Sequence, residues 1–180
     1  MLPPRPQASL LTGARYSELA GLRVSDVDLK AQTLWLRDTK AGKSRVVYLE
    51  DEGTRLLSTA IAGKPGGALV FPRPDGQRWN ASQQARYLQR ACVNGRVTPA
   101  ATFHDLRRTY GARLAMQGIS MAVIAEALGH ADERITRRHY AHLAPSYLSS
   151  VIREGAAGLR IVDASTTVTG IAARSSGRSP

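Results

Sequence analysis

A histidine and an arginine lie three residues apart, at His104 and Arg107, in a segment whose apolar residues recur at helical spacing. Residues at i and i+3 share one face of a helix, so both side chains can contact one anion. Gly111 lies one turn beyond Arg107 and lets another group approach the helix closely, because it has no side chain. We expect Arg108 to point outward. The alternative for this segment is a solvated basic face that holds no ligand.

Further along the chain, Tyr140 follows two arginines, Arg137 and Arg138, and a histidine. A phenol among cations can have its pKa lowered and become a nucleophile. His130 comes just after the expected end of a helix, where a histidine can interact with the helix dipole. The alternatives are a half-buried tyrosine beside phosphate-binding cations, and a histidine that only stabilises a helix end.

The first third of the chain contains another set of candidates. Arg15 lies near the start of a helical pattern, and Glu18 can hold its guanidinium; the alternative is a surface ion pair of about 0.2–0.5 kcal/mol. Lys40 and Lys43 lie in a polar segment that ends at Arg45, between two runs of β-forming residues. A flexible lysine on such a turn can reach into a site and donate a proton. The alternative is nonspecific contact between these cations and phosphate.

The elements that must position these residues are short. We expect residues 1–9, which hold three prolines, to form no helix interior, and Thr12 to cap the first helix. The runs 32–37 and 45–49 predict a β-hairpin. The remaining patterns predict a short strand over 68–71 and helices over 51–61, 80–93, 102–117, 120–128, 132–140 and 145–154. The predicted fold class is α+β with a helical majority.

Composition narrows the classes of function. The 180 residues are typical of one domain, and 25 Lys and Arg against 14 Asp and Glu give a net charge of +11, which favours a polyanionic partner such as nucleic acid. Ribosomal and membrane-surface proteins are the alternatives. Cys92, the single cysteine, excludes an internal disulfide and a cysteine-based zinc site. No segment has the roughly 20 apolar residues of a membrane span, and the first residues lack the apolar core of a signal peptide.

Taken in order, five motifs resemble the tyrosine recombinase family, which includes phage integrases and Xer-type recombinases. The resemblance extends from about Gly13 to Tyr147. The motifs are TG-x-R-x-x-E-L-x-x-L-x-x-x-D at Thr12–Asp26, TK-x-G-K-x-R-x-V at Thr39–Val47, H-x-L-R-R-T at His104–Thr109, LGH at Leu128–His130 and HYAHL at His139–Leu143.

The resemblance implies a role for each matching residue. By resemblance, Arg15 is the first arginine that clamps the phosphate, and Glu18 is the acidic residue that supports it. Lys40 donates a proton to the leaving 5′ oxygen, and Tyr140 is the nucleophile. His104 and Arg107 form the H-x-x-R pair, and His130 is the second histidine. The expected DNA contacts are Lys43, Arg45, Arg108, Arg137 and Arg138. The implied fold is a mainly helical catalytic domain with a small antiparallel β-sheet.

The implied activity is site-specific recombination of double-stranded DNA through a 3′-phosphotyrosyl intermediate. No metal or other cofactor is expected, and the chain has no carboxylate cluster suited to Mg²⁺. We expect a homotetramer on DNA, a monomer without it, no membrane association, and a cytoplasmic, nucleoid-associated protein of a prokaryote or phage. Two alternatives stay open, namely a catalytically silent DNA-binding remnant and a DNA-relaxing enzyme like the type IB topoisomerases.

The expected domain organisation has three parts. Residues 1–12 are a truncated lead in which the helix before the first motif is mostly missing, 13–162 are the catalytic domain, and 163–180 are a disordered tail. The segment after Pro145 carries an apolar face that includes Ile152. This face docks on a neighbouring protomer or folds back on its own core.

Overall fold

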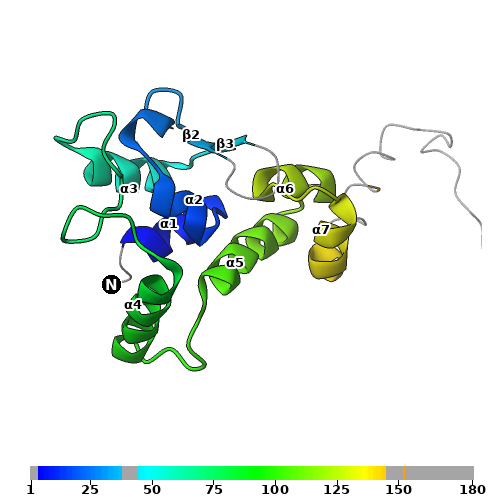
Figure 1. Ribbon diagram of the computed structural model, residues 1–180. Coiled ribbons are helices and arrows are strands. Elements are labelled where there is room, and N and C mark those ends of the chain that lie inside the picture. The colour runs from blue at the N-terminus through cyan, green and yellow to red at the C-terminus, as the bar shows by residue number, and fades with distance from the viewer. Residues whose placement is uncertain (1–3, 38–43, 145–151, 153–180) are drawn as a thin grey trace, which may run out of the picture. The chain divides into compact units, whose positions relative to one another are not determined.

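The computed structural model describes residues 4–37, 44–144 and 152. The chain divides into two compact units, Met1–Tyr147 and Leu148–Pro180, and every described residue except Ile152 belongs to the first (Figure 1). The elements are α1 (Pro4–Thr12), α2 (Tyr16–Gly21), η1 (Val24–Asp26), β1 (Val27–Asp28), β2 (Thr33–Leu36), β3 (Arg45–Tyr48), α3 (Asp51–Ile61), α4 (Ala81–Asn94), α5 (Phe103–Met116), α6 (Met121–Leu128), α7 (Glu133–Tyr140) and η2 (Ala141–Leu143). The order confirms the predicted α+β class with a helical majority.

The strands form an antiparallel sheet in the order β1-β2-β3. Leu34 pairs with Val47, and both side chains are buried, whereas Trp35 and its partner Val46 are exposed. This alternation is what a sheet with one solvated face requires. The predicted hairpin is therefore confirmed. β1 is an addition, because no strand was predicted over its residues.

The first helix corrects two expectations. Pro4 and Pro6 lie in the first turn of α1, where backbone N–H groups have no partner within the helix, so proline is tolerated there. Thr12 ends α1 instead of capping α2, and its hydroxyl donates to the carbonyl of Ala8 at 2.6 Å. Arg15 is the N-cap residue of α2. α1 spans nine residues and packs against α3 and α5.

The later helices begin and end where their capping residues predict. Asn80 caps α4, and Thr102 and Asp105 form the capping box of α5. Gly129, at φ +64°, ends α6 in the left-handed conformation. One detail differs: the strand expected over 68–71 is an isolated bridge from Arg23 to Leu69.

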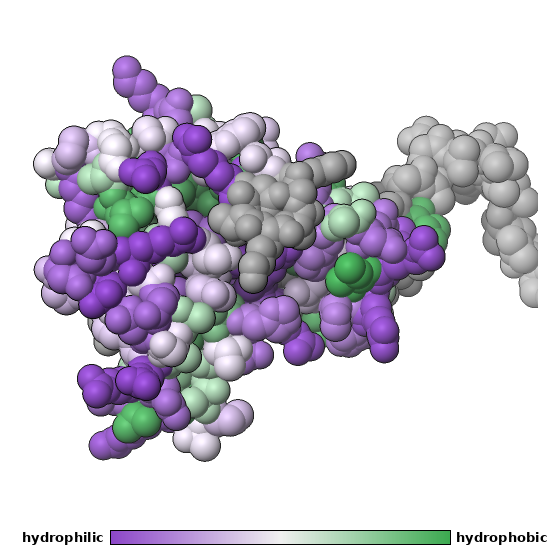
Figure 2. All heavy atoms as spheres, in the orientation of Figure 1, coloured by the Kyte–Doolittle hydropathy of each residue, from purple (hydrophilic) through white to green (hydrophobic). Residues whose placement is uncertain are grey.

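Three apolar clusters fill the interior. One lies between the sheet, α2 and α3, one joins α4 to α5, and one packs α5, α6 and α7 around Tyr140. Hydrophilic residues cover most of the face in Figure 2, with small apolar patches between them. None of the helices in the described part of the chain is long and apolar enough to cross a membrane. The predicted helix over 145–154, apart from Ile152, and the predicted tail lie outside the described residues.

Candidate active site

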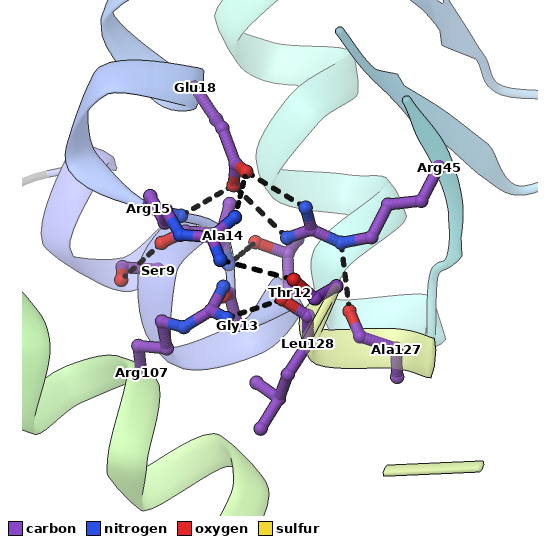
Figure 3. A network of polar contacts seen from close by, with 11 residues as sticks. Ser9, Thr12, Gly13, Ala14, Arg15, Glu18, Arg45, Arg107, Ala127 and Leu128 are labelled. Carbon is purple, nitrogen blue, oxygen red and sulfur yellow. Dashed lines mark hydrogen bonds and ion pairs between the residues drawn. The ribbon is translucent and has the colours of Figure 1, made fainter. Parts of the chain in front are cut away.

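Arg107 lies buried on α5 with an exposed fraction of 5%. Its Nη1 donates to the carbonyl of Gly13 at 2.7 Å and its Nη2 donates to the carbonyl of Leu128 (Figure 3). Burial, together with the charges of Arg15 and Arg45, lowers the pKa of Arg107 to about 10, so the guanidinium stays charged at neutral pH. Arg108 is exposed, as predicted from the sequence.

A buried carboxylate on α2, Glu18, holds two of the guanidiniums (Figure 3). Arg45 binds it with both terminal nitrogens, at 2.8 and 3.0 Å, and Arg15 binds it with Nη1 at 2.9 Å and with its backbone N–H at 2.6 Å. Burial acts to raise the pKa of Glu18, but the hydrogen bonds and charge of Arg45 and the bonds from Arg15 outweigh it. The pKa therefore lies below its ordinary value, and the carboxylate is ionised at neutral pH.

The end of α6 is the point at which the three arginines meet. Arg15 donates from Nη2 to the carbonyl of Gly129 at 3.1 Å, and Arg45 donates from Nε to the carbonyl of Ala127 at 3.0 Å. Together with the bond from Arg107 to Leu128, three successive carbonyls of this turn each accept one arginine. A Cβ atom on Gly129 would lie 2.8 Å from Nη1 of Arg45, so the glycine is needed for this approach as well as for its φ.

His130 follows this turn and is partly buried. Its Nδ1 shares a hydrogen bond of 2.8 Å with the hydroxyl of Thr136, a fully buried residue of α7. Burial first, and then the charges of Arg107 and Arg15, lower the pKa of His130 to about 4. The imidazole is therefore neutral at neutral pH. Sequence reasoning missed Thr136, since its contact with His130 depends on how α7 packs.

Tyr140 ends α7 and is buried against α5. A Cβ atom on Gly111 would lie 2.7 Å from Cζ and 2.9 Å from the hydroxyl oxygen of Tyr140, so the ring lies directly on this glycine. Burial raises the pKa of Tyr140, although the charges of Arg107 and Arg108 act to lower it. The expectation of a lowered pKa is therefore wrong, because loss of hydration outweighs the nearby cations.

The other predicted site residues lie in several places. Arg45 was expected to contact DNA, but its side chain is 8% exposed and its nitrogens bind Glu18 and Ala127, which gives it a structural position. His104 is exposed and, with Tyr16, borders a separate cavity of about 410 Å³. Arg138 is exposed, and Arg137 pairs with Glu133 at 2.7 Å. Lys40 and Lys43 lie outside the described residues.

The charges of this cluster do not cancel. Arg15, Arg45 and Arg107 carry three positive charges, Glu18 carries one negative charge, and His130 is neutral at neutral pH. The backbone carbonyls that hold the guanidiniums carry no formal charge. A surplus of about two positive charges thus remains in this cluster, and the Tyr140 ring lies on Gly111, one turn beyond Arg107. Such a surplus is suited to an oxyanion whose negative charge increases during a reaction.

The sequence matches the phage integrase family over residues 7–146. This chain belongs to that family. It is similar to the tyrosine recombinase XerD of Mycobacterium tuberculosis (strain CDC 1551 / Oshkosh), with 31% identity over 70% of this chain and 43% of the relative. Among solved structures, the catalytic domain of bacteriophage HP1 integrase matches with a TM-score of 0.63 and 29% identity, over 85% of this chain and 81% of that one.

A structure of the Tn1549 transposon integrase in complex with a circular intermediate DNA matches with a TM-score of 0.70. The match covers 84% of this chain and 57% of that one at 20% identity, and it shows that the two chains share a fold. These findings confirm the resemblance drawn from the motifs and the mainly helical fold with a small antiparallel sheet. The chain spans 40–43% of the length of the curated relatives it matches first.

Replacing Gly111 by alanine tests the contact with Tyr140 in this phage integrase family member. We expect Gly111→Ala to lower the free energy of unfolding by about 1–3 kcal/mol, because the new methyl group displaces the ring. Gly53→Ala is the matched control: it is also a helical glycine, but its Cβ atom would lie 3.5 Å from Leu49, an ordinary contact. It should be neutral or stabilising by up to about 1 kcal/mol. Urea unfolding measures both, and equal effects would contradict the close contact.

Replacing Glu18 by glutamine tests the shared carboxylate. We expect Glu18→Gln to lower the free energy of unfolding by about 3–5 kcal/mol, since Arg45 becomes a buried charge without its counterion. Asp26→Asn, the control, changes another buried carboxylate, whose partner Arg37 is largely exposed. Sodium sulfate, a tetrahedral oxyanion, should raise the melting temperature of the native chain and Asp26→Asn more than that of Glu18→Gln. Glu18→Gln has the larger positive surplus, but its guanidiniums are no longer held in position by the carboxylate. The same sulfate effect in both variants would contradict a role of Glu18 in positioning the cluster.

The lowered pKa of His130 predicts how stability depends on pH. Between about 6.5 and about 4 the unfolded histidine binds a proton that the folded one does not, so stability falls as the pH falls through this window. Glu18 contributes only below its ordinary value of 4.5. We therefore expect the melting temperature of the native chain to drop from pH 7 to pH 5. The drop should be smaller in His130→Gln and as large as in the native chain in the exposed control His142→Gln. An unaltered drop in His130→Gln would contradict this assignment.

Proposed function

We propose that this chain is the strand-cleaving part of a site-specific recombinase that acts on double-stranded DNA. The observation that carries the proposal is the placement of Tyr140 on Gly111, one turn beyond Arg107, while Arg107 and Arg15 both bind the turn that precedes His130. This placement supports the proposal that Tyr140 acts as the nucleophile together with two cations and a hydrogen-bonding imidazole. Membership of the phage integrase family and the net charge of +11 support DNA as the substrate.

The reaction that we propose conserves the energy of the broken bond. The oxygen of Tyr140 attacks the scissile phosphorus and forms a 3′-phosphotyrosyl bond, while the bond from phosphorus to the 5′ oxygen breaks. Lys40 donates the proton that turns this oxygen into a hydroxyl group. A 5′ hydroxyl later attacks the phosphotyrosyl bond, rejoins a strand and frees the tyrosine, so no other energy source is needed.

The arginine cluster would stabilise the transition state electrostatically. A phosphodiester carries one negative charge, which increases when the phosphorus becomes pentavalent. Arg15 and Arg107 each have five N–H groups, of which two make hydrogen bonds in the described part of the chain, so each keeps donors for the nonbridging oxygens. We propose that Arg45 and Glu18 act as positioning residues for these guanidiniums.

The two histidines would have different tasks. His130 is neutral, and its Nδ1 is held by Thr136, so we propose that its other ring nitrogen makes a hydrogen bond to the phosphate. The raised pKa of Tyr140 means that the phenol keeps its proton at neutral pH, so attack requires a proton acceptor. We assign proton transfer to His104, on the same face of α5 as Arg107. Groups of this kind contribute about 10²–10⁴-fold to a rate.

We further propose that the active form is a homotetramer assembled on paired DNA sites and that the protein works in the cytoplasm. The exposed cations Arg108, Arg137 and Arg138 would contact the DNA backbone. Such binding weakens with salt, with a slope of log K against log salt of roughly −0.9 for each neutralised phosphate.

Replacing Tyr140 by phenylalanine tests the nucleophile. A nicked suicide substrate should give the native chain a covalent adduct on a denaturing gel. Tyr140→Phe should abolish the adduct and leave DNA binding nearly unchanged, because it removes one oxygen. Tyr110→Phe is the matched control, since this tyrosine lies on α5 against Gly13, and it should keep the adduct.

The outcomes of that experiment distinguish the recombinase from the two alternative functions and test the choice of nucleophile. An adduct in Tyr140→Phe would overturn the assignment, and Tyr147 would be the next candidate. DNA binding by the native chain without any adduct would favour the catalytically silent remnant. Relaxation of supercoiled DNA without exchange between two sites would favour a topoisomerase-like activity.

A further inference from the structure

A cavity of about 810 Å³ lies away from the arginine cluster, between α1, α3 and the segments that follow α3. Apolar side chains form much of its wall, among them Leu11, Leu56, Val70 and Phe71. Ligand sites in proteins combine such apolar walls with a few polar groups that point inward. The reaction proposed above uses no residue of this cavity.

The polar groups of the cavity include two buried donors. Arg5 lines the wall with an exposed fraction of 5%, and its Nε and Nη2 have no hydrogen-bond partner among the residues that the structure describes. Trp79 lies beside it, 5.1 Å from the Arg5 guanidinium to the ring centroid, and its indole N–H is also buried without a partner in this part of the chain. Unpartnered buried donors are unfavourable, so native proteins contain few of them.

The charge of the cavity favours an acidic occupant. Arg5, Arg55 and Lys64 line it against a single carboxylate, Glu52, and Lys64 already donates to the carbonyl of Val70 at 2.8 Å. Burial lowers the pKa of Arg5 to about 10, while Tyr87 acts to raise it, so the guanidinium remains charged at neutral pH. The cation–π contact with Trp79 does not supply a counterion.

We propose that this cavity is a docking site for a segment of polypeptide that carries a carboxylate among apolar side chains. The carboxylate would bind the free edge of the Arg5 guanidinium and the Trp79 indole N–H, and the apolar side chains would pack against the partly buried Leu11 and Leu56. Cavity size and apolar walls argue against a nucleic acid backbone, which offers phosphate and sugar. The curated relatives are more than twice as long as their match to this chain, and that further polypeptide is one source of such a segment.

Fluorescence of Trp79 can report occupancy directly. A Trp35→Phe background leaves Trp79 as the only tryptophan, because the sequence has two. The probes are a short acetylated and amidated peptide with one glutamate between leucine and phenylalanine residues, and its glutamine counterpart. We expect the glutamate peptide to shift the Trp79 emission and raise the melting temperature, and to bind about tenfold more tightly than the glutamine peptide.

Variants at Arg5 make the proposal falsifiable. Arg5→Met should melt at or above the temperature of the parent, because it removes an unpartnered buried cation, and it should lose the preference for the glutamate peptide. Arg113→Met, which changes an exposed arginine of α5, should keep that preference. Equal binding of the two peptides, or an unchanged preference in Arg5→Met, would overturn the proposal. Phenylpropionate binding as tightly as the peptide, or a DNA oligonucleotide displacing it, would overturn the choice of polypeptide as the occupant.

Discussion

The buried carboxylate of Glu18 is the interaction on which the arrangement of the site depends. Removing an ion from water is unfavourable by several kcal/mol, and only well-aligned partners offset this. Glu18 has such partners in Arg45 from β3 and Arg15 from the start of α2. A carboxylate shared in this way fixes the sheet and α2 relative to each other. It also explains why Arg45, which follows the lysine-rich segment in the sequence, lies in the interior.

The end of α6 completes the arrangement. The last carbonyls of a helix have no partner within it, and the helix dipole makes this end electronegative. Here the carbonyls of Ala127, Leu128 and Gly129 accept hydrogen bonds from arginines of three different elements. The left-handed Gly129 turns the chain so that His130 follows immediately. The three arginines are thus held close together by hydrogen bonds to the end of one helix.

Local signals in the sequence predicted most helices and the hairpin. Asn80, Thr102 and Ser120 cap their helices through contacts with residues three positions away, so their effect can be read without knowing the fold. The positions of Arg45 and Thr136 could not be predicted in this way. Their partners are Glu18, 27 residues distant, and the imidazole of His130, whose direction depends on the packing of α7. The motifs singled out Arg15, Glu18 and Arg107, which meet at the end of α6, whereas burial raised the pKa of Tyr140 against the expectation from its neighbours.

The use of backbone carbonyls explains how the cluster can be rigid and still attract an anion. If carboxylates held all three guanidiniums, their charges would cancel and a phosphate would gain little by binding. Carbonyls fix Arg107 through two hydrogen bonds while leaving its charge uncompensated. Burial, together with the same charge, lowers the pKa of His130 and keeps the imidazole neutral, so the histidine adds no further repulsion. A phosphate therefore meets guanidiniums whose orientation is already fixed, which reduces the reorganisation needed when its charge increases.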